Sequence, residues 1–103
     1  MPAAPSLAPD TQTVEQVRLA PLFRVLIHND EKTPMDFVVH VLFAVFHKPI
    51  EDSIQIMLEA HHTGAALVTV LSLEEAEFRV EKAHATARGD KYPLTFSYEP
   101  EEK

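Results

Sequence analysis

The sequence of 103 residues has no cysteine, no tryptophan and only two glycines. Without cysteine there is no disulfide, no thiolate zinc site and no thiol nucleophile, which is typical of a protein in a reducing compartment. No apolar run approaches the roughly 20 residues that span a bilayer. The first basic residue is Arg18, so the N-terminus does not look like a signal or transit peptide. We therefore expect a cytoplasmic protein without a membrane partner.

Positive charge is also scarce. Nine Lys and Arg residues stand against 16 Asp and Glu residues, which gives a formal net charge of −7 and an isoelectric point near 5.2. Because phosphate groups are bound by basic side chains, this balance argues against nucleic acid as the main partner. A cationic ligand or a basic partner surface would fit the charge better. Nothing in the sequence indicates oligomerisation, and we expect a monomer.

Motifs for catalysis and for metal binding are missing. There is no Gly-x-Ser-x-Gly elbow and no glycine-rich phosphate loop. Asp30 and Glu31 are a carboxylate pair that suits acid–base chemistry, but a domain with two glycines shows no substrate cleft. The histidines have neither the HExxH pattern nor a Cys/His spacing: His28, His40, His47, His61, His62 and His84. We predict no enzyme, no metal and no cofactor; a histidine-based metal protein or hydrolase is a remaining alternative.

The chain divides into a tail, one domain and a short end. Residues 1–20 combine proline with Ala, Ser and Thr, a composition that predicts a disordered N-terminal extension. This extension is either a passive leader or an arm used by a partner. Residues 21–99 are predicted to form one domain, and residues 100–103 are predicted to fray.

Hydrophobic periodicity predicts six elements in the order β-α-α-β-α-β. They are strands at 22–28, 65–71 and 94–98 and helices at 35–46, 50–63 and 73–88. This order predicts an α+β two-layer sandwich, in which three helices pack on one face of a three-stranded antiparallel sheet. The nearly continuous apolar run at 65–71 predicts that this strand is central.

Local signals predict the element ends and the buried helix faces. Ser72 with Glu75 forms a capping box, Gly64 and Gly89 stand at helix ends, and Thr33 is predicted as the N-cap before Pro34. The second helix is predicted to carry Ile50, Ile54, Met57, Leu58 and His61 on one side. The third is predicted to bury Leu73, Ala76, Val80, Ala83 and Ala87.

The polar turn after the first strand has more acceptor side chains than a helix start needs. If the two first helices are antiparallel, His61 returns to this turn and meets Asn29 and Asp30. An amide oxygen, a carboxylate and a neutral imidazole can accept the three donors of an ammonium group. Apolar residues lie on the same edge: Met35, Val38, Met57 and Leu94. This arrangement would suit a primary amine with a bulky side chain.

Four stretches resemble a known family. They are Asn-Asp-Glu-Lys-Thr-Pro-Met-Asp-Phe-Val at residues 29–38, Met-Leu-Glu-Ala-His-His-Thr-Gly at 57–64, Glu-Glu-Ala-Glu-Phe-Arg-Val at 74–80 and Tyr-Pro-Leu at 92–94. In order and spacing they resemble the ClpS family, the adaptors that deliver N-end-rule substrates to the Clp protease. The resemblance covers about three quarters of the chain.

The resemblance implies a function and a set of site residues. Such adaptors bind proteins with an N-terminal Leu, Phe, Tyr or Trp and deliver them to a Clp AAA+ unfoldase, through the N-terminal domain of a ClpA-like protein, for ATP-dependent proteolysis. Residues 1–20 would correspond to the extension that engages the unfoldase. The implied residues are Asn29, Asp30 and His61 for the α-amino group, Thr33, Met35, Val38, Met57, Ala60 and Leu94 for the side-chain pocket, and Glu74 and Arg79 for the unfoldase. A regulator of the same fold that has lost substrate delivery is the alternative.

The chain departs from the family pattern at several positions. Glu31 stands in place of an Asp, Arg79 in place of a Lys, and Val68 and Thr69 in place of Cys-Gly. Ala60 replaces the usual Val and predicts a roomier pocket, more tolerant of Trp or altered in its preference for Leu. These departures mark a divergent member of the family, such as a second paralogue.

Overall fold

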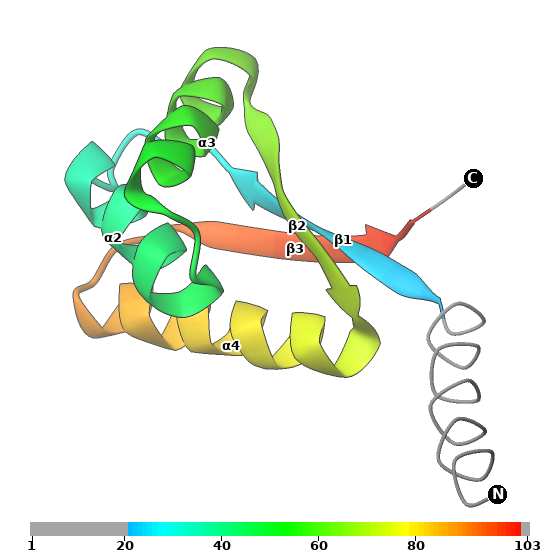
Figure 1. Cartoon of the computed structure of the whole chain (residues 1–103). Coiled ribbons are helices and arrows are strands. Elements are labelled where there is room, and N and C mark those ends of the chain that lie inside the picture. The colour runs from blue at the N-terminus through cyan, green and yellow to red at the C-terminus, as the bar shows by residue number, and fades with distance from the viewer. Residues whose placement is uncertain (1–20, 102–103) are drawn as a thin grey trace, which may run out of the picture.

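The strands and helices of the computed structural model, which describes residues 21–101, follow the predicted order (Figure 1). Their bounds are β1 Leu22–His28, α2 Met35–Phe46, α3 Ile50–Thr63, β2 Ala65–Ser72, α4 Leu73–Gly89 and β3 Thr95–Pro100. The predicted extension at residues 1–20 lies outside the described residues. β3 reaches Pro100, and the N–H of Glu101 donates to the carbonyl of Leu22 at 2.7 Å. Strand pairing therefore extends into the segment that was predicted to fray.

The sheet has the order β2-β1-β3, and both pairings are antiparallel. The prediction that the strand beginning at Ala65 is central is wrong, because β1 holds that position. An apolar run indicates that both faces of a strand are apolar, but it does not indicate how many strands pair with it. On β2 the buried Val68 alternates with Leu67, which is 43% exposed at the sheet edge.

All three helices lie on the same side of the sheet, as Figure 1 shows, which confirms the predicted two-layer α+β fold. The core between the layers is built from the apolar faces of every element. Its most deeply buried members include Val25, Ile27, Val41, Leu42, Ala76, Ala83, Ala87 and Leu94. The alanines of α4 let this helix approach the sheet closely, because they bury no long side chain.

Two predicted helix faces need correction. On α3 the buried residues are Ser53, Met57 and Ala60, whereas Ile50, Ile54 and Leu58 are 39–47% exposed and His61 is also exposed. Ser53 can be buried because its hydroxyl donates to the Lys48 carbonyl at 3.3 Å. On α4 the predicted face is right except for Leu73, which is 42% exposed in the first turn.

The predicted element ends are largely confirmed. The Ser72 hydroxyl accepts the Glu75 N–H at 3.3 Å at the start of α4. Gly64 ends α3 with φ of 99°, a left-handed conformation that favours glycine, and its N–H donates to the Ala60 carbonyl at 2.8 Å. Gly89 is the last residue of α4. The stop at Gly64 brings His61 close to the loop that follows β1, and after the stop at Gly89 the ring of Tyr92 packs against Phe37 of α2.

Candidate functional site

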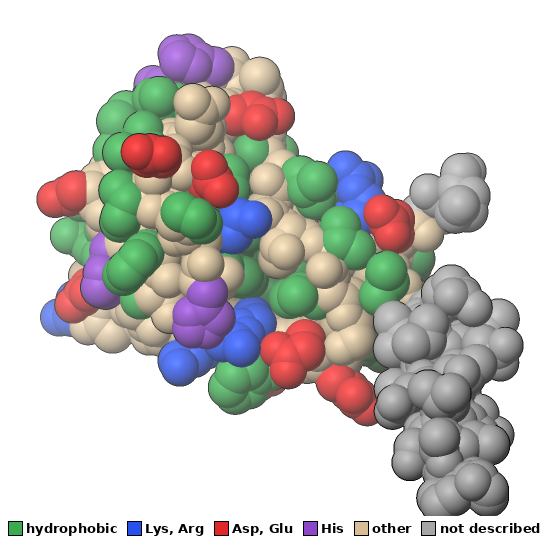
Figure 2. Space-filling model, in the orientation of Figure 1, with side chains coloured by type: hydrophobic (Ala, Val, Ile, Leu, Met, Phe, Trp, Pro, Cys, Tyr) green, Lys and Arg blue, Asp and Glu red, His purple; other side chains and the backbone are tan. Residues whose placement is uncertain are grey.

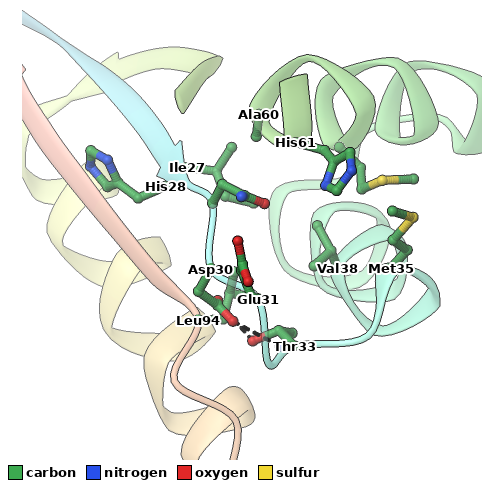
Figure 3. Close-up of a pocket in the computed structure, with 12 residues that line it drawn as sticks. Ile27, His28, Asp30, Glu31, Thr33, Met35, Val38, Ala60, His61 and Leu94 are labelled. Atoms are coloured by element: carbon green, nitrogen blue, oxygen red, sulfur yellow. Dashed lines mark hydrogen bonds between the residues drawn. The ribbon is translucent and has the colours of Figure 1, made fainter. Parts of the chain in front are cut away.

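A pocket opens where β1 ends and the polar loop leads into α2 (Figure 3). Its cavity has a volume of about 350 Å³. The walls come from the loop, from α2 and α3, and from the residue before β3. The lining residues are Ile27, His28, Asn29, Asp30, Glu31, Thr33, Met35, Val38, Met57, Ala60, His61 and Leu94. All nine residues that the sequence assigned to an amine site and a side-chain pocket therefore lie around one cavity.

The interior of the pocket is apolar and buried. Ile27 at the end of β1 and Leu94 before β3 are each 1% exposed, and Val38 and Met57 are buried on the facing helices. Ala60 is buried on α3 and contributes only a methyl group to the wall. Met35 is 46% exposed in the first turn of α2, so its side chain is free to move at the mouth. Such a cavity offers van der Waals contact to one apolar group.

Asp30 organises the loop at the mouth. One carboxylate oxygen, Oδ1, accepts the N–H groups of Lys32 and Thr33, each at 2.7 Å. The other, Oδ2, accepts the hydroxyl of Thr33 at 2.9 Å, and Figure 3 shows this contact on the side of the loop next to Leu94. Both oxygens thus hold the loop conformation.

These contacts correct the predicted start of α2. Thr33 does not cap the helix, because its hydroxyl is engaged by Asp30. The N-cap is Pro34, with φ of −62° and ψ of 146°, and it has no side-chain cap bond. Thr33 is nevertheless buried and lines the pocket, as predicted.

The environment of Asp30 favours its charged form. Burial opposes ionisation, but the hydrogen bonds from Thr33 and Lys32 and the positive charge of Arg88 outweigh it, so the pKa of Asp30 lies below its ordinary value of 3.8. The carboxylate is therefore ionised at neutral pH. A negative charge beside an apolar cavity is suited to a cationic group.

The other polar residues of the mouth are exposed and available. The backbone N–H of Asn29 donates to the Gly64 carbonyl at 3.0 Å, which ties the end of β1 to the end of α3. This bond brings Asn29 close to the helix turn that carries His61. Among residues 21–101, no hydrogen bond holds the side chains of Asn29, Glu31 or His61, so these groups can accept donors from a ligand.

Three pocket residues were not assigned from the sequence. Ile27 follows Val25 on the core face of β1, and this alternation was a sufficient signal for its place. Glu31 belongs to the same acidic turn as Asp30 and lines the pocket although it departs from the family's Asp. His28 lines the cavity too, but its Nε2 lies 2.7 Å from the Ser97 hydroxyl on β3, which fixes its ring against the sheet.

The two residues assigned to the unfoldase lie on α4 and do not line the pocket. Glu74 is exposed in the first turn. The guanidinium of Arg79 donates to the Val45 carbonyl at 3.2 Å and to Glu75 Oε1 at 3.3 Å. It also lies 3.1 Å from Nε2 of His47, which ends α2 in a left-handed conformation. Arg79 thus supports the end of α2, and contact with an unfoldase stays a prediction.

Within the described part of the chain, no group of three His, Asp or Glu side chains is placed to hold a metal ion. No helix between residues 21 and 101 is both long and apolar enough to cross a bilayer.

Together the fold and the pocket define a class: a small α+β domain with a cavity of side-chain size and polar acceptors at its mouth. The sequence profile described as "ATP-dependent Clp protease adaptor protein ClpS" matches residues 18–97. The chain belongs to this family of Clp protease adaptors.

Relatives and a solved structure agree with this assignment. An ATP-dependent Clp protease adapter protein ClpS from Desulfatibacillum aliphaticivorans is 42% identical over 92% of this chain and 88% of its own length. One from Myxococcus xanthus is 38% identical over 94% and 91%. The structure of Agrobacterium tumefaciens ClpS2 bound to L-phenylalaninamide superposes with a TM-score of 0.76 and is 36% identical, covering 79% of this chain and 98% of that one.

Proposed function

We propose that this adaptor binds the free N-terminus of proteins that begin with Leu, Phe, Tyr or Trp and delivers them to a Clp AAA+ unfoldase. The observation that carries the proposal is the pocket itself, in which Asn29, Asp30 and His61 line the mouth of an apolar cavity of about 350 Å³. This volume is at the small end of ligand pockets and suits one side chain. Phenylalaninamide, the ligand in the Agrobacterium tumefaciens structure, is a free amine with an aromatic side chain.

The α-amino group is the cationic half of this ligand. A free N-terminus has a reference pKa of about 7.7–8.0 and is mostly protonated at neutral pH. An ammonium group at the mouth meets the amide oxygen of Asn29, the imidazole of His61 and the negative field of Asp30. Loss of one partner from a desolvated charged contact costs on the order of 2–5 kcal/mol. We therefore expect binding to depend strongly on a free amine.

The first side chain is the apolar half. Its burial against Val38, Met57 and Leu94 contributes roughly 1.5–3 kcal/mol. Met35 and Met57 are flexible and polarisable, which suits a pocket that accepts both Leu and aromatic rings. A β-branched Val or Ile would press against the wall near the amine site. Binding without bond cleavage fits a non-catalytic adaptor, which works through the unfoldase.

Calorimetry with two peptides tests the proposal. One peptide begins with a free Phe, and the second is identical except that its N-terminus is acetylated. We expect the free peptide to bind and the acetylated peptide to lose at least about 100-fold in affinity, since it has no ammonium group. Equal binding of both peptides would refute the amine site.

A further inference from the structure

Large apolar side chains are exposed along the helix pair formed by α2 and α3. Five of the nine large hydrophobic residues that are exposed among those described belong to these two helices, and Val39 on α2 is half-buried. We define this apolar strip as Met35, Val39 and Phe43 on α2 with Ile50, Ile54 and Leu58 on α3. Figure 2 shows hydrophobic side chains exposed on the side of the molecule where these helices lie, among acidic and histidine side chains.

The two halves of the strip lie on neighbouring helices that pack against each other. On each helix the residues recur every four positions, so each set follows one side of its helix. The opposite side of α3 faces β2, because Asp52, Gln55 and Ile56 share a hollow with Leu67 and Val68. The strip therefore lies on the side of α3 next to α2, with which α3 packs.

The strip continues directly from the pocket. α2 and α3 are joined by only three residues, so the start of α2 lies beside the end of α3. Met35 belongs to the strip and also lines the pocket. Leu58 is three residues before His61, one turn from the amine site. At the other end, Phe43 and Ile50 lie next to the connection between the helices.

The dimensions favour a short peptide. Eight helical residues span about 12 Å, which is the length of three to four extended residues. With helices 8–10 Å apart, the strip covers on the order of 100–200 Å². A stable dimer buries roughly 800 Å² on each partner, so a second copy of this chain needs far more surface than the strip offers.

We propose that this strip binds the residues that follow the first residue of the substrate, and that it selects substrates in which they are apolar. The inference rests on the proposed function of the pocket, which holds the N-terminus at Asn29, Asp30 and His61 and the first side chain beside Met35. From there the bound chain leaves the mouth and extends along the strip. Because side chains of an extended segment alternate, about two of the next four residues contact the strip.

Two peptides with the same first residue test this inference. Both begin with Phe and end in the same polar tail; one continues with Leu, Ala and Leu, the other with Ser, Gly and Ser. We expect the apolar peptide to bind the full chain about three- to tenfold more tightly in fluorescence anisotropy, since it buries part of two leucines. F43S or I54S should reduce this advantage to less than about twofold and leave the affinity for the polar peptide unchanged.

A matched control is available on α4. Phe78 is 52% exposed, close to the 48% of Phe43, but it lies outside the strip. F78S should keep the full advantage of the apolar peptide. Circular dichroism should show that all three variants are folded.

The possible failures are distinguishable. If the wild type binds both peptides equally while acetylation abolishes binding, the strip has no role and the pocket assignment stands. If no peptide with a free Phe binds, both proposals fail. If sedimentation shows a dimer that F43S dissociates, the strip is covered by a second copy and the inference is overturned.

Discussion

Asp30 combines structural contacts within the loop with a negative charge beside the pocket. Its two oxygens accept three hydrogen bonds from Lys32 and Thr33, so the loop depends on it. Its lowered pKa keeps the charge in place at neutral pH. A change to Ala therefore removes the loop contacts together with the charge, and the two effects have to be separated by the choice of variant.

For Asp30 we predict that D30N and D30A differ. The Asn side chain keeps an oxygen for the N–H groups of Lys32 and Thr33 but removes the charge, so peptide affinity should fall about tenfold or more with little loss of stability. D30A should also lower the free energy of unfolding by about 1 kcal/mol, because the exposed and partly buried donors of Lys32 and Thr33 lose their acceptor. Calorimetry and urea unfolding measure the two effects.

The acidic turn offers an internal control. Glu31 lines the pocket, and its carboxylate accepts no hydrogen bond from the described residues, so E31Q tests its charge without loss of a loop contact. If D30N binds like the wild type and E31Q does not, Glu31 rather than Asp30 faces the ammonium group.

Since the pKa of Asp30 is lowered, the contribution of Asp30 to stability is present above about pH 3.8 and is lost as the pH falls through the folded-state pKa.

Ala60 should set the size of the pocket. It is 3% exposed and lines the cavity. We predict that A60V narrows the cavity, because it adds two methyl carbons to the wall. Binding of peptides that begin with Trp should weaken by about three- to tenfold, and binding of peptides that begin with Leu should change less. Anisotropy with peptides that differ only in their first residue measures this. An unchanged preference would mean that Ala60 does not determine specificity.

At the scale of elements, His84 joins α4 to β3. Its Nε2 accepts the N–H of Phe96 at 2.9 Å, and Phe96 packs against Phe46 of α2 with ring centroids 5.1 Å apart. Burial of the ring and the charge of Arg88 lower the pKa of His84 below its usual 6.5. Protonation at Nε2 would break the bond to Phe96, so the neutral form belongs to the folded state.

We predict that this contact makes stability depend on pH. Because the folded-state pKa is the lower one, the unfolded chain binds more protons between the two values, and the contribution is full above about pH 6.5 and lost as the pH falls through the folded-state pKa. Urea unfolding at about pH 8 and about pH 5.5 should show a smaller fall for H84Q than for the wild type. An equal loss of stability in H84Q and in the wild type would mean that other histidines cause the pH dependence.

The elements also show how far the sequence determines the structure. Caps depend on neighbouring residues, and the N-cap at Ser72 and the helix stop at Gly64 were predicted correctly, whereas the Glu75 carboxylate of the predicted capping box accepts from Arg79 instead. The face of α3 was predicted wrongly, because Ile50, Ile54 and Leu58 form as regular an apolar row as the buried one. The position of β2 was predicted wrongly. A strand that is covered by helices shows the same apolar run in its sequence as a strand that lies between two others.

The residues of the site were easier to predict than their contacts. Asn29, Asp30 and His61 were expected to meet, and the structure places them around one pocket. The bond between Thr33 and Asp30 was not foreseen, since the sequence permits Thr33 either to cap the helix or to contact the acid. Geometry alone distinguishes these alternatives.

For the whole molecule, the pocket and α4 provide two separate surfaces. We predict that E74K leaves the affinity for a Phe peptide unchanged and abolishes the acceleration of Phe-substrate degradation by a Clp unfoldase and its protease. Glu74 is exposed and remote from the cavity, so its effect should be confined to the partner. Degradation of a fluorescent substrate with an N-terminal Phe measures the acceleration.

Arg79 provides the contrasting case. Since it donates to the Val45 carbonyl, R79A should lower stability as well as delivery, whereas E74K should lower delivery alone. If the wild type binds both the peptide and the unfoldase without accelerating degradation, the chain is a regulator and delivery is disproved.

The direction of β1 has a practical consequence. The strand enters the sheet at Leu22 and reaches the pocket at His28, and Glu101 pairs with Leu22 at the far end. Seven strand residues span about 23 Å, so both ends of the described chain lie well away from the ligand site (Figure 1). The domain can therefore be immobilised on a bead or sensor chip through either of these ends with its pocket directed to the solution. If the pocket binds free N-termini as proposed, the immobilised domain would serve as an affinity reagent that enriches protein fragments by their first amino acid.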